Sequence, residues 1–269
     1  MTVLLHKELS YAVRGVLFDV YNTLGPMLPE RFYQTAVAVG LERKKIACQT
    51  EKQFNVLYRG VEVGRYFTDL WIEDGKLLLE LKVAPDILPI HLAQAISYLK
   101  VTGADVGFVV NFGAASLVDR RLPNFVHDKT AVFDWTPPNF APDSPDPVLT
   151  ATLLEIAHRV HFELGSGFFH HVYRRAVMFE LRERSINHEF VKQIPISYQN
   201  VHLGNQESRL LLIEDKVLLV PIAVKQIDQA IKNQLKARMR HLNVTYCLIA
   251  NFNKPQLETR IINTTYKSK

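Results

Sequence analysis

The feature that most constrains this chain is an internal repeat: its second half follows its first half at a constant offset of 140 residues. The segment "LGPMLPERFYQTAV" (24–37) aligns with "LGSGFFHHVYRRAV" (164–177), and "VVNF" (109–112) aligns with "IANF" (249–252). Between residues 24 and 112, 20 of 89 positions are identical without a gap. A period this long indicates two copies of a domain and not a solenoid of short repeats.

A proline-rich segment separates the two copies. Residues 134–150, "DWTPPNFAPDSPDPVLT", contain five prolines and no helical or strand periodicity. Such a composition is typical of a semi-rigid linker. We therefore expect one domain at residues 1–133, a linker at 134–150 and a second domain at 151–269.

Each copy shows the same succession of hydrophobic patterns. In the first copy two helices, three strand-like runs, a helix and a strand are expected at 6–21, 29–42, 50–59, 61–72, 76–83, 88–101 and 105–112. Residues 113–133 are expected to add irregular structure or a short final strand. Helices before and after a central β-meander predict an α/β or α+β layered domain.

The positive charge of the chain is concentrated in its second copy. Residues 1–133 hold 15 Lys/Arg against 14 Asp/Glu, whereas residues 151–269 hold 17 against 10. This asymmetry favours contact between the second copy and a polyanion. A solvated basic surface without a partner is the alternative.

The remaining composition is that of a globular protein in a reducing compartment. No apolar run approaches the ~20 residues that a membrane span needs, and the N-terminus has no basic region or small-residue cleavage site typical of a signal peptide. The two cysteines, Cys48 and Cys247, lie far apart and lack ligand-like spacing. We therefore expect a cytoplasmic protein without a disulfide framework or a zinc cluster.

The hairpin "TDLWIEDGKLLLELKV" (68–83) places ionisable side chains in an apolar run. Asp74-Gly75 favours a two-residue turn, which would put Asp69 directly opposite Glu80 and Lys82 on the same face. Two carboxylates at that distance repel each other unless a cation lies between them, and such oxygen ligands suit Mg²⁺ or Mn²⁺. An ordinary salt bridge on an exposed strand is the alternative, but the apolar runs around it favour a covered strand.

Four segments together resemble the GxxExxY family, a group of small bacterial proteins in the PD-(D/E)XK nuclease superfamily. They are "GPMLPERFY" (25–33), "YFTDLWIEDGKLLLELKV" (66–83), "HLAQAISYLKVTG" (91–103) and "VVNFG" (109–113). The resemblance implies a restriction-endonuclease-like α/β core, with a small mixed sheet flanked by helices in each tandem domain. It also implies divalent-metal-dependent hydrolysis of phosphodiester bonds, but no particular substrate.

The resemblance carries the superfamily's catalytic residues onto Asp69, Glu80 and Lys82. Asp69 and Glu80 would hold the metal, and Lys82 would orient the attacking water or offset phosphate charge. It adds Glu30, an acid at the start of a helix, and Gln94 in a Q-x-x-x-Y pattern, while the motif's leading glycine is Met27 here. An acid in a first helical turn is also favoured by the helix dipole, and Gln94 is alternatively a core-facing amide.

The second copy has lost this pattern. At the offset of 140, Glu30, Asp69, Glu80 and Lys82 become His170, Arg209, Val220 and Ile222. Pro221 interrupts the strand-like run there, which predicts an edge strand or a distorted ladder. Metal-dependent catalysis is therefore expected only in the first copy.

Basic residues gather in the second copy where acids are gone. The segment 225–241 is expected to be a helix on which Lys225, Lys232 and Lys236 share one face. The residues expected to contact a phosphate backbone are Lys225, Lys232, Lys236, Arg238, Arg240, Arg174 and Arg175. The alternative is a scaffold half that completes an intramolecular pseudo-dimer.

The sequence thus favours a nuclease with one active domain and one inactive, substrate-docking domain. A catalytically silent nucleic-acid-binding or regulatory protein derived from a nuclease is the second hypothesis, and a protein–protein scaffold is the third. The sequence does not distinguish DNA from RNA, because no aromatic platform for single strands and no recognition helix stands out.

Overall fold

A computed structural model describes residues 5–124, 132–136, 146–199 and 201–264. The chain divides into two compact units, Met1–Val132 and Phe133–Lys269. Most of the predicted linker, 137–145, lies outside the described residues. The first helix of the second unit begins within the predicted linker, at Pro147, where Asp146 caps it by accepting a hydrogen bond from the backbone N–H of Leu149.

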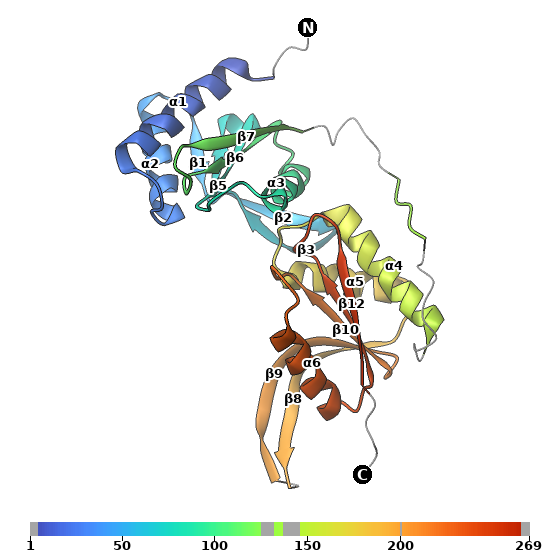
Figure 1. Ribbon diagram of the computed structural model, residues 1–269. Coiled ribbons are helices and arrows are strands. Elements are labelled where there is room, and N and C mark those ends of the chain that lie inside the picture. Colours follow the sequence, from blue (N-terminus) through green and yellow to red (C-terminus); the bar gives the residue numbers. More distant parts are fainter. Residues whose placement is uncertain (1–4, 125–131, 137–145, 200, 265–269) are drawn as a thin grey trace. The chain divides into compact units, whose positions relative to one another are not determined.

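The first unit is a mixed sheet with helices on both faces (Figure 1). Its sheet has the strand order β1-β4-β5-β6-β7, with β5 and β6 parallel and the other pairs antiparallel. Its helices are α1 (Lys7–Leu24), α2 (Glu30–Arg43) and α3 (Pro89–Thr102). Its strands are β1 (Cys48–Thr50), β2 (Gln53–Tyr58), β3 (Val61–Phe67), β4 (Leu70–Ile72), β5 (Leu77–Lys82), β6 (Val106–Asn111) and β7 (Val118–Pro123).

The two faces of β5 belong to different layers. Leu77, Leu79 and Leu81 point into a core shared with α1 and α2. The alternate residues, including Glu80, face the opposite side because side chains alternate along a strand. There α3 packs on β6, and Gly107 lets it approach closely, since a Cβ at that position would lie 3.2 Å from the side chain of Leu99.

The predicted strand 61–72 is two strands. β3 pairs only with β2, in a separate two-stranded ribbon, whereas β4 belongs to the five-stranded sheet. The chain leaves one sheet for the other at Thr68 and Asp69, and Thr68 is held there by a hydrogen bond from its N–H to the carbonyl of Lys52. The polar pair Thr68 and Asp69 interrupts the hydrophobic run at this junction.

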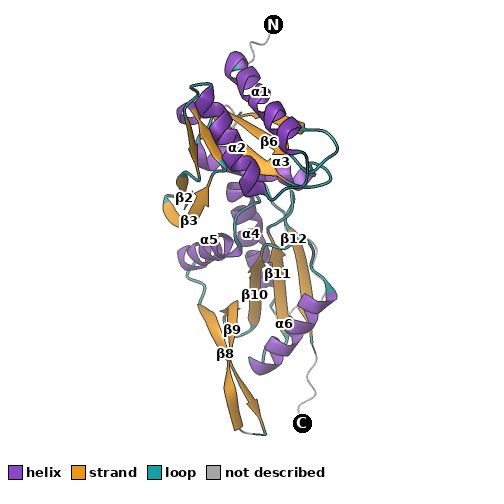
Figure 2. Ribbon diagram, turned by 90° about the vertical axis from the view of Figure 1, so that its left-hand side faces the viewer, coloured by secondary structure: helices purple, strands orange, loops and turns teal. Residues whose placement is uncertain are grey.

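The second unit repeats the arrangement with a longer hairpin. Its sheet has the order β12-β11-β10-β9-β8, and β8 and β9 form an arm that extends away from the sheet (Figures 1 and 2). Its helices are α4 (Pro147–Leu164), α5 (His170–Glu183) and α6 (Gln229–His241). Its strands are β8 (His188–Tyr198), β9 (Val201–Ile213), β10 (Val217–Ile222), β11 (Tyr246–Asn251) and β12 (Glu258–Asn263).

Residues shared by the two copies make the same contacts in each. The hydroxyl of Tyr33 donates to the carbonyl of Gly25 over 2.7 Å and its ring stacks on Phe112; Tyr173 bonds to Gly165 over 3.0 Å and stacks on Phe252. These contacts fix the turn between the first two helices of each unit against the sheet. The repeated identities therefore maintain the fold.

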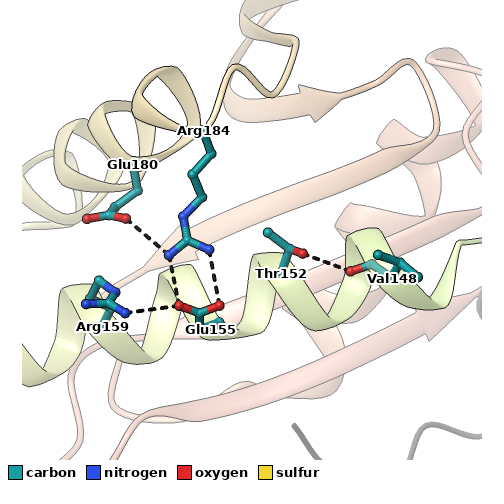
Figure 3. A network of polar contacts seen from close by, with 6 residues as sticks. All are labelled: Val148, Thr152, Glu155, Arg159, Glu180 and Arg184. Atoms are coloured by element: carbon teal, nitrogen blue, oxygen red, sulfur yellow. Dashed lines mark hydrogen bonds and ion pairs between the residues drawn. The ribbon is translucent and has the colours of Figure 1, made fainter. Parts of the chain in front are cut away.

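The second unit joins its first two helices with an ion network (Figure 3). The guanidinium of Arg184, the residue that follows α5, contacts both carboxylate oxygens of Glu155 on α4, at 2.9 and 3.2 Å, and approaches Glu180 at 3.4 Å. Arg159 also binds Glu155, at 3.1 Å. Because Glu180 is almost fully buried, its charge needs this partner.

Candidate active site

The candidate site lies where β5 meets the link between β3 and β4. The pairs Leu70–Leu79, Trp71–Leu78 and Ile72–Leu77 give the register that the sequence predicts for this hairpin. Asp69 directly precedes Leu70, and its carboxylate oxygen Oδ2 accepts a hydrogen bond of 2.7 Å from the backbone N–H of Leu81. The side chain of Gln34 on α2 donates to the backbone carbonyl of Asp69 and holds the link in place.

The turn that sets this register has a left-handed backbone at residues 73–75. Glu73, Asp74 and Gly75 all have positive φ angles, 47°, 50° and 97°, and the N–H of Lys76 donates to the carbonyl of Glu73. An added side chain at Gly75 would lie within 2.5 Å of the Trp71 ring. Glycine is therefore required at this position both for its conformation and for space.

Glu80 is the buried centre of the site. Only 7% of its surface is exposed. Its oxygen Oε1 lies 2.6 Å from the ammonium of Lys82, and its oxygen Oε2 accepts a hydrogen bond of 3.1 Å from the hydroxyl of Tyr66. The predicted proximity of an acid and a base on one strand face is thus present as a direct ion pair.

Tyr66 is a site residue that the sequence analysis missed. It lies on β3, its hydroxyl reaches Glu80, and its ring stacks on Tyr98 of α3 with a centroid distance of 4.0 Å. Tyr98 closes the Q-x-x-x-Y pattern that begins at Gln94. A usable signal was present: position 206, which aligns with Tyr66, is glutamine, so the tyrosine is absent where the acids are absent.

The carboxylates perturb one another. Burial, followed by the charge of Glu80, raises the pKa of Asp69 to about 8, against the opposing effect of the Leu81 N–H. Burial also raises the pKa of Glu30, with Lys82 acting to lower it and Glu80 to raise it. Burial by itself would lower the pKa of Lys82, but Glu80 and the other acids outweigh it and raise that pKa above its ordinary value.

The two remaining predicted residues come from helices. Glu30 is the first residue of α2, half-buried, and its charge acts on both Asp69 and Lys82. Gln94 lies on α3, one turn before Tyr98 and therefore on the same side of that helix. The arrangement gathers acids, one lysine and one tyrosine around the end of β5, and carboxylates of this kind can hold a divalent metal ion.

The comparison with protein-family models gives a match over both halves of the chain. The model of the PD-(D/E)XK nuclease superfamily matches residues 7–122 and again residues 147–263. The chain belongs to the PD-(D/E)XK nuclease superfamily. Neither the curated proteins nor the solved structures yield a match. None of the described helices combines the length and apolar character needed to cross a membrane.

Membership of the PD-(D/E)XK superfamily agrees with the observed fold and suggests a nuclease-like function. Two tandem domains, each a mixed sheet flanked by helices, are present as predicted. Nucleases of this superfamily generally depend on a divalent metal ion. The match does not extend to the narrower GxxExxY group, which remains a prediction.

The site's donors suit a hard cation that keeps most of its waters. Among the described residues no group of three or more His, Cys, Asp and Glu side chains is arranged to hold a metal. Asp69 and Glu80 instead supply a pair of carboxylates, and both oxygens of Glu80 already have partners. Mg²⁺ is commonly held by one or two carboxylates together with water and substrate phosphate, so the residues fit such an ion.

The second domain of this PD-(D/E)XK protein places a different residue at the Asp69 position than the gap-free alignment does. Ile72 pairs with Cys48 and Leu77 in the first domain, and Ile213 pairs with His188 and Val217 in the second. His188 and Val217 align with Cys48 and Leu77 at the offset of 140. Ile213, the structural counterpart of Ile72, lies at an offset of 141 instead. The structural counterpart of Asp69 is therefore Leu210, and the predicted correspondence with Arg209 is wrong.

The extra residue is absorbed by a bulge in β9. Leu210 pairs with Val191 and Glu207 with Gln193, so Ser208 and Arg209 together lie opposite the single residue Lys192. A sequence comparison without gaps cannot detect such a shift, because the shorter turn at 214–216 restores the offset. Leu210 and Val220 now belong to one aliphatic cluster, and no acid occupies either position.

Of the two alternatives predicted at Pro221, the edge strand is wrong and the distorted ladder is present. β10 is the central strand of its sheet, and Pro221 pairs in register with Ala250 of β11. The ladder to β9 ends at the pair Leu219–Leu211, two residues before Pro221. On that side Pro221 is not paired with β9, so the missing N–H of proline breaks no ladder hydrogen bond there.

The predicted basic helix is shorter than expected. α6 begins at Gln229 after Asp228, whose side chain accepts a hydrogen bond from the N–H of Ile231. Lys225 precedes the helix and does not share its face, contrary to the prediction. Lys232, Lys236 and Arg240 follow one another at intervals of four residues and do lie on one side of α6.

Proposed function

We propose that this protein is a metal-dependent nuclease with its catalytic centre in the first domain. The observation that carries the proposal is the meeting of Asp69, Glu80 and Lys82 in one buried site, supported by the superfamily match over that domain. Buried charges of this kind are costly to keep unless they serve a site. The second domain carries aliphatic residues at both acid positions and has no such centre.

Each residue has a role that follows from its position. Asp69 and Glu80 would hold a Mg²⁺ or Mn²⁺ ion, with Glu30 as a third acid from α2. When bound, such an ion would polarise the scissile phosphate and lower the pKa of the attacking water. Lys82, paired with Glu80, would orient the water or offset charge on the phosphate. Tyr66 would hold Glu80 in place through its hydroxyl, and Gln94 would position the substrate from α3.

The second domain would dock the nucleic acid, DNA or RNA. The residues proposed for this contact are Lys225, Lys232, Lys236, Arg238, Arg240, Arg174 and Arg175. The excess of 17 basic over 10 acidic residues in 151–269 supports this division of labour, because phosphate contacts dominate non-specific affinity. Association of the two homologous halves as an intramolecular pseudo-dimer belongs to the same proposal.

Cleavage of labelled nucleic acids tests the catalytic assignment. Single- and double-stranded DNA and RNA are incubated with Mg²⁺, Mn²⁺ or EDTA, using wild type, Asp69→Asn and Lys82→Gln. Asp74→Asn is the matched control, because Asp74 is an exposed acid on the same hairpin. We expect metal-dependent cleavage that the first two variants lose by at least about 100-fold and that the control retains. Equal cleavage by all four proteins would rule out the assigned centre.

One observation favours a second candidate function. Both oxygens of Glu80 are engaged, one by Lys82 and one by Tyr66, so the carboxylate is satisfied without a metal ion. A catalytically silent nucleic-acid-binding or regulatory protein would keep this arrangement as a structural core. It predicts salt-dependent binding of nucleic acid with no Mn²⁺ uptake in calorimetry, whereas the nuclease predicts Mn²⁺ uptake that Asp69→Asn weakens.

A further inference from the structure

The first turn of α5 in the second domain gathers basic side chains from two elements. His170 opens the helix at the position of Glu30 in the first domain, and Arg174 follows one turn later. Arg209 reaches them from the β9 bulge, where its guanidinium nitrogen Nη1 lies 3.0 Å from Nε2 of His170. His171 lies close enough for its pKa to be lowered by Arg174 and Arg209, after burial and Arg175.

Arg174 and Arg209 lack acidic partners within the described part of the chain. No ion pair there involves Arg174 or Arg209, whereas Arg159, Arg184 and Arg260 of the same domain each bind a carboxylate. Nη1 of Arg174 is buried and has no hydrogen-bond partner, and its guanidinium lies over the ring of Phe190 at 4.5 Å. A buried donor without a partner is unfavourable, and an acceptor that reached it would relieve that cost.

The N-terminus of α5 adds to the positive electrostatic potential of these side chains. No side chain caps α5, whose preceding residue is Phe169, whereas Asp146 and Asp228 cap α4 and α6. The first backbone N–H groups of a helix favour a negative charge in front of them. Burial, and next the charges of Arg174 and Arg209, lower the pKa of His170, so the cluster repels additional positive charge.

We propose that His170, Arg174 and Arg209 form a binding site for a phosphate group of a nucleic-acid backbone. Phosphate matches the cluster because its oxygens accept from guanidinium N–H groups and its charge offsets theirs. The proposal rests on the docking role assigned to the second domain above, and it gives that role a defined site. The bulge at Ser208–Arg209 creates the site, since it places Arg209 against α5 while Leu210 takes the former acid position.

Binding in the absence of divalent metal tests this site separately from catalysis. Fluorescence anisotropy with labelled single-stranded and duplex DNA and RNA is measured in EDTA for wild type, Arg174→Gln and Arg209→Gln. Arg182→Gln is the matched control, because Arg182 is an exposed arginine on the same helix. We expect each site variant to weaken binding about tenfold and to reduce the salt slope by about one, with the control within about twofold of wild type.

Three outcomes would overturn the proposal. The first is equal affinity for nucleic acid in wild type and Arg209→Gln. Thermal melting reports whether Arg174→Gln is folded; if it is not, Arg209→Gln decides the test, because Arg209 is exposed. The second is an equal loss in Arg182→Gln, which would indicate general charge only. The third is calorimetric binding of inorganic phosphate that Arg209→Gln abolishes while nucleic-acid binding is unchanged, which would identify a free-phosphate site. Loss of binding in Arg209→Gln supports the site even if no nucleic acid is cleaved.

Discussion

The backbone N–H of Leu81 donates to the carboxylate of Asp69 over 2.7 Å, just beyond the last paired residues of β4 and β5. In the second domain the corresponding residues are Pro221 and Leu210, so the donor and the acceptor are both missing. Leu210 has a side chain that needs no hydrogen-bond donor, so the missing N–H of Pro221 costs it nothing. An aspartate at position 210 would lack the backbone donor that Asp69 has in Leu81. The loss of the acid and the arrival of the proline are thus physically consistent with each other.

Replacing Leu81 by proline should disable the site while the fold persists. Leu81→Pro removes the N–H that orients Asp69, and Pro221 shows that this strand position accommodates proline. Leu81→Ala is the control, because it also shortens the buried side chain but keeps the N–H. We expect the Mn²⁺ affinity measured by calorimetry to be about tenfold lower in Leu81→Pro than in Leu81→Ala, because the proline variant loses one hydrogen bond to a charged group. Equal affinities would show that the bond does not position Asp69.

Removing the Tyr66 hydroxyl should impair catalysis more than folding. Tyr66→Phe keeps the ring stacked on Tyr98 but frees one oxygen of Glu80. We expect the cleavage rate to fall roughly tenfold through misplacement of that carboxylate. Tyr33→Phe is the comparison, because the Tyr33 hydroxyl bonds to backbone groups of the α1–α2 turn. That variant should lower the melting temperature and leave the rate unchanged; the opposite pattern would contradict both assignments.

The metal-free first domain should lose stability as the pH rises. The pKa of Asp69 is raised to about 8 in the folded chain, against about 3.9 when unfolded. The unfolded chain therefore releases this proton first, and stability is lost between about pH 4 and pH 8. In EDTA, the melting temperature of wild type should fall more over this range than that of Asp69→Asn. Parallel curves for the two proteins would contradict the raised pKa.

The ion network of the second domain should give the opposite pH response. Hydrogen bonds from Arg184 lower the pKa of Glu155, so the stability it contributes is present above the unfolded value of about 4.3 and is lost as the pH falls further. Glu155→Gln should cost about 1 kcal/mol at pH 7 and have little effect at pH 3. Chemical denaturation of the two proteins at both values measures this; an equal difference at pH 3 would exclude a charge effect.

The sequence predicted the tandem domains, most helices and strands, and the hairpin register that brings Asp69 toward Glu80. These follow from signals that can be read along the sequence: the long repeat, the hydrophobic periodicity and the Asp-Gly turn. The bulge that substitutes Leu210 for Arg209 is set by pairing between distant strands, so it was not predictable from an alignment without gaps. Tyr66 was missed for a related reason, because its contact with Glu80 joins two separate sheets.

Met27 gives a stability prediction that the sequence alone would not support. It has a φ of 68°, in the left-handed region, and Gly167 occupies the same place in the second domain with a φ of 112°. A residue with a Cβ is strained there, so Met27→Gly should raise the free energy of unfolding by up to about 1 kcal/mol. Met27→Ala retains the Cβ and should give no such gain. Because Met27 is exposed, little packing is lost in either variant. Denaturant unfolding of both proteins tests this, and an equal gain in the two would exclude backbone strain as the cause.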